Sequence, residues 1–161
     1  MEIRETAISD LDKVMEIYEK ARQYMRDNGN RNQWTNGYPS SELIIKDIKD
    51  KSSYVCVDDQ QIVGVFRFTL GIDPTYVHIY EGNWLNDEPY GVVHRIASAS
   101  KKMGVASHCL NWCLNQCNNI RIDTHEDNYI MQNLLKKNGY TECGIIYLES
   151  GDARIAYHKV K

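Results

Sequence analysis

Residues 93–107 read Val-His-Arg-Ile-Ala-Ser-Ala-Ser-Lys-Lys-Met-Gly-Val-Ala-Ser, and this stretch decides the fold. Apolar and β-branched residues over 92–97 predict a strand, and the segment 106–117 predicts a helix. The small-residue turn between them directs backbone amides outward, where the helix dipole and two lysines attract an anion. Gly104 and Ala106 leave room for a ligand close to the backbone. The stretch therefore predicts a pyrophosphate-binding loop, with solvated lysines on a ligand-free turn as the alternative.

Signals on both sides of this stretch predict one mixed α/β domain over residues 1–161. Apolar residues at steps of three and four predict a helix that begins with a capping box at Ser9 and stops at Asn28-Gly29-Asn30. The segment 71–91 is broken by turn formers, and within it residues 76–80 alternate like a strand. The other predicted elements are strands at 3–6, 53–57, 61–70, 92–97, 120–124, 140–148 and 153–159, and helices at 40–50, 106–117 and 128–138.

Two motifs resemble signatures of the GNAT superfamily of acyl-CoA-dependent N-acetyltransferases. Lys101-x-x-Gly104-x-Ala106 is similar to the family's CoA-binding loop, with lysine in place of the usual Gln or Arg. The segment 128–140 is similar to the family's Asn-x-x-Ala-x-x-Leu-Tyr-Glu-Lys-x-Gly-Phe helix. The predicted element order also matches from the first strand to the last hairpin. The resemblance implies an α/β (mixed α+β) fold, a single GNAT-like domain whose central sheet is splayed at the cofactor cleft and flanked by about four helices.

The resemblance also implies where acetyl-CoA would lie as co-substrate. The backbone of Ile96, Ala97 and Ser98 is expected to pair with the pantetheine arm, and Asn128 is expected to contact the same arm. The tyrosine that often protonates the leaving thiolate in this family falls on Leu135, which has no proton to give. The loop expected to hold the pyrophosphate comprises Lys101, Lys102, Met103, Gly104, Val105, Ala106 and Ser107.

An amine acceptor must lose a proton near neutral pH, and three residues are candidates for the general base. His94 lies two residues before Ile96, and strand alternation predicts that both side chains share a face. His125 ends a predicted strand that faces the expected cleft. Glu81 lies in an aromatic segment suited to wall a pocket for a cationic amine. The structural alternatives are a hydrogen-bonded core histidine at 94, helix capping around 125 and a loop anchor at 80–84.

Composition limits the partners of the protein. The net charge of -3 argues against non-specific attraction to nucleic acid or to an anionic membrane. With no signal peptide and no membrane-spanning run, we expect a cytoplasmic location. Five cysteines without a CxxC pair suit a reducing compartment. Cys109, Cys113 and Cys117 recur at every fourth position, which favours core thiols over metal ligands, and no metal is predicted.

These observations predict an N-acetyltransferase that moves an acetyl group from acetyl-CoA to a primary amine by direct transfer. The acceptor is expected to be a small-molecule amine or a peptide amine. The alternative is a non-catalytic CoA-binding or regulatory module on the same fold, which Leu135 favours because the usual acid is missing. The sequence leaves the acceptor, the general acid and the oligomeric state open, including a homodimer.

Overall fold

Seven strands form one mixed sheet in the order β1-β2-β3-β4-β5-β7-β6. The computed structural model describes residues 1–99 and 102–161. Within these ranges the α-helices are α1 (Leu11–Asp27), α2 (Ser41–Lys49), α3 (Val105–Cys117) and α4 (Tyr129–Lys137). The strands are β1 (Glu2–Glu5), β2 (Ser53–Asp58), β3 (Gln61–Leu70), β4 (Gly91–Ser98), β5 (Asn119–Thr124), β6 (Thr141–Tyr147) and β7 (Ala153–Val160).

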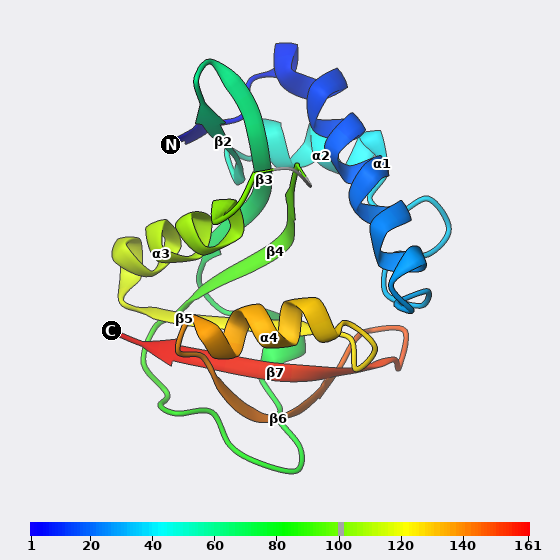
Figure 1. The fold of residues 1–161 in the computed structure, drawn as a ribbon. Helices are drawn as coiled ribbons and strands as arrows, with labels where there is room; N and C mark the ends of the chain where they lie inside the picture. Colours follow the sequence, from blue (N-terminus) through cyan, green and yellow to red (C-terminus); the bar gives the residue numbers. More distant parts are fainter. Residues whose placement is uncertain (100–101) are drawn as a thin grey trace.

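The two central strands, β4 and β5, run parallel but are paired at only two positions. Gly91 lies opposite Ile120, and Val92 lies opposite Arg121. Beyond Val92 the two strands diverge and divide the sheet into two halves (Figure 1). A mixed sheet splayed between its central strands and accompanied by four α-helices confirms the fold class predicted from the sequence.

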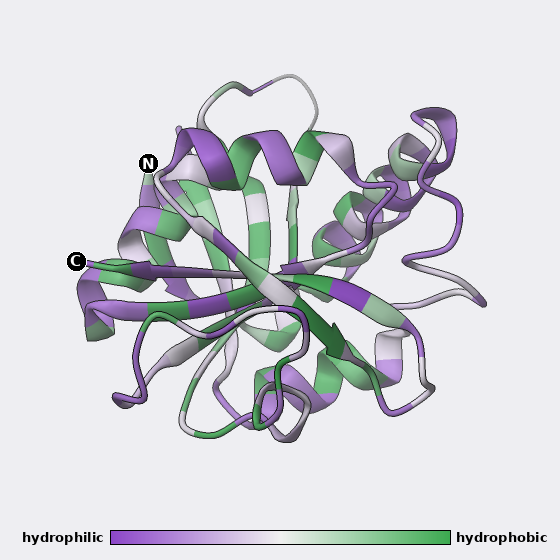
Figure 2. Cartoon of the chain, turned by 90° about the horizontal axis from the view of Figure 1, so that it is seen from below, coloured by the Kyte–Doolittle hydropathy of each residue, from purple (hydrophilic) through white to green (hydrophobic). Residues whose placement is uncertain are grey.

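Helices cover both faces of the N-terminal half of the sheet. Alternate residues of a strand point to opposite faces, so Val65 packs with α1 and α2 whereas Phe66 packs with α3. Leu135 of α4 joins the same core cluster as α3. Figure 2 shows hydrophobic bands recurring among hydrophilic ones along the helices, the pattern of elements with one buried face. No helix in the described ranges is long and apolar enough to cross a membrane.

The ends of α1 are set by local hydrogen bonds. A 3₁₀ turn at Ile8–Asp10 precedes the helix, and the Asp10 carboxylate accepts from the Ala7 amide at 2.7 Å. The predicted start is therefore correct to within two residues, but neither Ser9 nor Asp10 caps α1 with its side chain, and the Asp10 carboxylate instead closes the preceding 3₁₀ turn. At the other end Gly29 has a left-handed φ of 85°. The Asn30 amide donates to the Met25 carbonyl at 2.8 Å, a Schellman closure that fixes the position of Asn30.

The segment between β3 and β4 forms no strand at residues 76–80, although these residues alternate like one in the sequence. Asp73 caps a 3₁₀ turn at Pro74–Tyr76, because its carboxylate accepts from the Thr75 amide at 2.9 Å. Only Tyr80 makes a β-bridge, to Ile145 of β6. The segment covers one face of the C-terminal strands, where Tyr76 and other apolar residues form a third core cluster.

Candidate active site

A cavity of about 690 Å³ lies between the C-terminal half of α1, the end of β4, the first turn of α3, and α4. This volume falls within the range of small-molecule sites. Met103 is not among the lining residues and is 91% exposed, and Lys101 lies outside the described residues. The predicted cofactor-binding residues that do line it are Ile96, Ala97, Ser98, Lys102, Gly104, Val105, Ala106, Ser107 and Asn128.

The first turn of α3 presents its backbone to this cavity. Gly104 adopts a left-handed φ of 80°, and a Cβ placed there would have no atom within 4 Å. The α3 hydrogen bonds begin where the His108 amide donates to the Gly104 carbonyl at 3.0 Å. The amides before His108 lack helical partners and carry the positive end of the dipole, so they can bind an anion. Lys102 lies at the same end and pairs with Asp58 at 2.6 Å.

A bulge in β4 separates the two residues that were expected to share a face. Arg95 and Ile96 both lie opposite Phe66 of β3, and Arg95 has a φ of 51°. Ile96 lines the cavity, whereas His94 contacts the segment between β3 and β4 on the opposite face. The predicted alternation of His94 and Ile96 is therefore wrong, because it assumed a regular strand.

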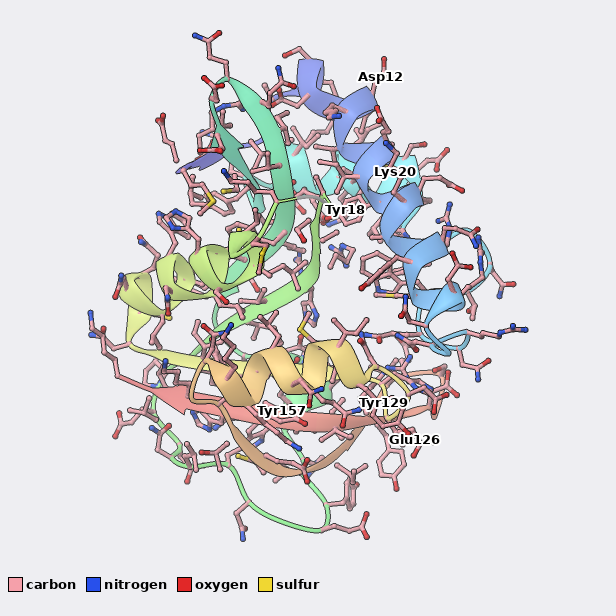
Figure 3. The ribbon with its side chains drawn as sticks, viewed as in Figure 1. Asp12, Tyr18, Lys20, Glu126, Tyr129 and Tyr157 are labelled. Carbon is pink, nitrogen blue, oxygen red and sulfur yellow. The ribbon has the colours of Figure 1, made fainter. Side chains whose placement is uncertain are left out.

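The strained backbone at Arg95 is held by three partners from the helical layer. The Tyr18 hydroxyl donates to the Arg95 carbonyl at 2.8 Å, and Figure 3 shows Tyr18 projecting from α1 toward β4. The Arg95 guanidinium pairs with buried Asp47 of α2 at 2.6 Å and donates to the Tyr38 hydroxyl at 2.9 Å. A non-glycine residue with positive φ persists only where surrounding contacts impose it. These contacts therefore fix the bulge at the splay.

His94 and Asp73 form a hydrogen-bonded pair just past the last paired position of β4 and β5. The Nε2 atom of His94 lies 2.9 Å from Asp73 Oδ2, and Asp73 Oδ1 accepts from Thr75. Burial alone would raise the pKa of Asp73, but the hydrogen bonds from His94 and Thr75 outweigh burial and lower it to about 2. An ionised carboxylate only accepts, so Nε2 carries the proton and Nδ1 of neutral His94 is left as the acceptor nitrogen.

Across the splay from His94, a second hydrogen bond joins Tyr76 to Asp123 of β5. The Tyr76 hydroxyl donates to Asp123 Oδ2 at 2.6 Å, and its ring centre lies 6.2 Å from that of His94. Burial raises the pKa of Asp123 and, together with the Asp123 carboxylate, raises that of Tyr76. Tyr76 therefore stays protonated and keeps its role as donor.

None of the three candidate bases is among the residues that line the cavity. His125 Nδ1 accepts from the Asp127 amide at 3.0 Å, so its ring stabilises the turn before α4. Glu81 is exposed, with a φ of 57°, next to the bridge between Tyr80 and Ile145. Leu135, at the position of the family's tyrosine, is fully buried in the main core cluster.

Both polar atoms of the Asn128 side chain make hydrogen bonds. Its Oδ1 accepts from the Met131 amide at 3.1 Å and caps α4, while its Nδ2 donates to Gln33 Oε1 at 2.9 Å. Gln33 Oε1 also accepts from Asn30 Nδ2 at 3.0 Å. Gln33 thus joins the connection after α1 to the start of α4 across the open part of the sheet.

Cys109 and Cys113 are buried in the main core cluster, as predicted, and Cys117 is half-buried. Burial raises the pKa of the Cys109 and Cys113 thiols, which keeps them uncharged and unreactive. The described residues contain no group of three or more side chains arranged to hold a metal ion.

Comparison with solved structures connects this geometry to a family. The crystal structure of a GNAT-family acetyltransferase from Streptococcus agalactiae is 34% identical to this chain, covers 99% of it and 95% of the other chain, and has a TM-score of 0.91. This chain belongs to the GNAT family. The sequence matches no protein-family model and is not significantly similar to a curated protein.

More distant GNAT-like structures share the fold. The ribosomal-protein-alanine N-acetyltransferase of Brucella melitensis is 14% identical over 100% of both chains, with a TM-score of 0.69. A chain of the NatC complex bound to Gag peptide and CoA is also 14% identical, over 100% of this chain and 99% of that one, with a TM-score of 0.60. At these identities the likeness shows the GNAT fold alone.

Sequence analysis of this GNAT chain missed Asp73, Tyr76, Asp123 and Gln33. The first two lie in the segment between β3 and β4 whose outline could not be predicted. Asp123 lies within the strand predicted at 120–124, two residues before His125. By contrast, Asn30, which donates to Gln33, lies within the predicted helix stop Asn28-Gly29-Asn30.

Proposed function

We propose that this GNAT protein transfers an acetyl group from acetyl-CoA to a primary amine by direct attack, with both substrates bound at the splay. The proposal rests on the positions of the cavity and of the His94–Asp73 pair relative to the sheet. The cavity reaches the end of β4 on one face of the sheet, and the His94–Asp73 pair lies beside the same opening on the other face. An acyl donor and an amine can then approach each other from opposite faces.

The cavity residues fit the chemistry of CoA. The open backbone at Gly104, the first amides of α3 and the ammonium group of Lys102 suit the pyrophosphate. The end of β4, from Ile96 to Ser98, offers strand backbone for the amides of the pantetheine arm. The NatC complex, a chain of which has this fold, was solved with CoA bound, which supports this assignment by analogy of fold.

In the proposed reaction the amine nitrogen attacks the thioester carbonyl carbon, the new C–N bond forms and the C–S bond breaks. The nitrogen must lose one proton, and His94 Nδ1 accepts it directly or through a water molecule. Asp73 holds the ring and stabilises the protonated form, as a positioning residue. The departing thiolate takes a proton from solvent, since Leu135 offers none. Holding the two reactants together supplies much of the rate.

The acceptor is proposed to be a small-molecule or peptide amine. The Brucella melitensis ribosomal-protein-alanine N-acetyltransferase, which shares the fold, is an example with a protein acceptor. We further propose a cytoplasmic location, because buried free thiols suit a reducing compartment. The full burial of Leu135 favours a second candidate, a CoA-binding module without turnover.

The test is release of CoA thiol from acetyl-CoA in the presence of a panel of primary amines and amino-terminal peptides. We expect amine-dependent thiol release by the parent and by His125→Ala, and a loss of about 10²- to 10⁴-fold in kcat for His94→Ala. CoA binding without thiol release for any amine would favour the binding module. Equal rates for His94→Ala and the parent would remove His94 as the base.

A further inference from the structure

One of the residues that line the cavity carries a buried side-chain oxygen without a partner in the described residues. Asn30 lines the cavity and is only 3% exposed, and its Oδ1 accepts no hydrogen bond within the described part of the chain. An unpaired buried acceptor is destabilising because it has lost its hydrogen bonds to water, so native proteins rarely keep one without a reason. A bound molecule that donates a hydrogen bond there would remove this cost.

The orientation of the Asn30 amide follows from a chain of hydrogen bonds that starts at a backbone amide. The Met131 N–H can only donate, so the Asn128 atom that faces it is Oδ1, and Asn128 Nδ2 must face Gln33. Nδ2 can only donate, so the Gln33 atom between the two asparagines is Oε1. Asn30 therefore turns its own Nδ2 to Gln33, and Oδ1 is the atom left without a partner.

The backbone holds Asn30 as firmly as its side chain does. The left-handed Gly29 and the bond from the Asn30 amide to the Met25 carbonyl close α1, as described above. Gln33 also accepts from Thr124 Oγ1 of β5 at 3.5 Å. The backbone of Asn30 and its Nδ2 are thus held at the junction between the two halves of the sheet.

We propose that Asn30 is a ligand-binding residue, that its Oδ1 accepts a hydrogen bond from an amide N–H of the pantetheine arm, and that Gln33 positions it. The inference rests on the proposed function. A ligand anchored at Gly104 that extends past Ile96 enters the same cavity as Asn30, and the pantetheine arm carries two amide N–H groups along that path. The oxygen is shielded from water, so the bond forms as the inner wall adjusts to the arm.

The test compares the affinities of CoA and adenosine 3′,5′-bisphosphate, which lacks the pantetheine arm, by titration calorimetry. For Asn30→Ala we expect the Kd of CoA to rise about 3- to 10-fold and the Kd of the bisphosphate to change less than about twofold. Asn28→Ala is the matched control. Asn28 also lines the cavity, but its side chain is exposed and bonded to the Tyr24 carbonyl, so both Kd values should stay near parental.

Parental CoA affinity in Asn30→Ala, or an equal loss in Asn28→Ala, would overturn the inference and leave the proposed function intact. Failure of the parent to bind CoA would instead overturn the proposed function, and this inference with it. If Asn30→Ala folds poorly, ¹⁵N NMR of the parent protein provides the test. The Asn30 side-chain amide resonances should shift with CoA and stay in place with the bisphosphate, and the absence of a CoA-induced shift would overturn the inference.

Discussion

The Nε2 atom of His94 lies 2.9 Å from Oδ2 of Asp73, and this bond ties β4 to the segment that follows β3. It lies two residues beyond the last position at which β4 and β5 are paired. The ionised carboxylate holds the ring with Nδ1 free of hydrogen bonds in the described residues. The same geometry gives His94 both a fixed tautomer and a place beside the opening of the sheet.

Asp73→Asn should slow turnover. The amide can still accept from Nε2, but it no longer stabilises a positive charge on His94. We expect kcat to fall about 10-fold or more at every pH where the parent is active, because the ring loses the negative charge beside it. The measurement is kcat from pH 5 to 9 with a fixed amine. Parental kcat values would mean that Asp73 does not act through the base.

Removing the partner of Lys102 should strengthen binding of an anionic ligand. Asp58 neutralises the Lys102 ammonium in an exposed pair, and its own pKa is lowered chiefly by that bond. Asp58→Asn is expected to lower the Kd of CoA about 2- to 5-fold, and the gain should vanish in Lys102→Ala. Calorimetry on the two single variants and the double variant measures this coupling. A gain that persists without Lys102 would assign the effect to another group.

Leu135→Tyr should destabilise the protein without supplying the missing acid. Leu135 is fully buried in the main core, so a larger, polar side chain is expected to lower the free energy of unfolding by about 1–3 kcal/mol. Leu134→Tyr is the matched control, since Leu134 lines the cavity and its replacement should cost less. Urea unfolding compares the two. Equal stabilities would show that position 135 has more room than its burial indicates.

The buried His158 should make the protein acid-sensitive. Its Nδ1 accepts from the Leu85 amide and its Nε2 bonds to Asn119, and burial together with Arg121 lowers its pKa from 6.5 to about 4. The unfolded chain therefore binds this proton more readily, and stability falls as the pH falls from about 6.5 to 4. At pH 5 the loss relative to pH 8 is about 2 kcal/mol.

His158→Gln keeps one acceptor and one donor but cannot be protonated, so this contribution should disappear. Urea unfolding at pH 8 and pH 5 measures the difference for both proteins. If the parent and the variant lost the same free energy between these two pH values, His158 would not be the group responsible.

A structural feature can be predicted from the sequence when the residues that determine it lie close together in the chain. The strand-loop-helix around Gly104 and the stop at Gly29 are local, because a small residue and a left-handed backbone identify them. The bulge at Arg95 is not local. It depends on contacts with Tyr18 and Asp47, which lie far away in the sequence. The prediction assumed a regular strand without a bulge, and it therefore put His94 on the same face as Ile96.

The hydrogen-bonded pairs beside the opening of the sheet could not be predicted, for a related reason. Asp73 and Tyr76 lie in a segment without periodicity, shaped by an aspartate cap, a proline and packing on the C-terminal strands. Their partners His94 and Asp123 belong to two different strands. Only the assembled sheet brings these four side chains together. The resemblance in the sequence could therefore indicate the cofactor loop but not the residues across from it.

The central claim is that the cavity at the first turn of α3 binds acetyl-CoA, and a matched pair of variants at Gly104 tests it most directly. Asparagine and aspartate both tolerate the left-handed φ of 80° and have the same shape, but only aspartate brings a negative charge to the anion site. Calorimetric titration with acetyl-CoA should show one site in the parent, a similar or modestly weaker site in Gly104→Asn, and a loss of about 30-fold or more in Gly104→Asp. Equal affinity in the two variants, or no binding by the parent, would contradict the account.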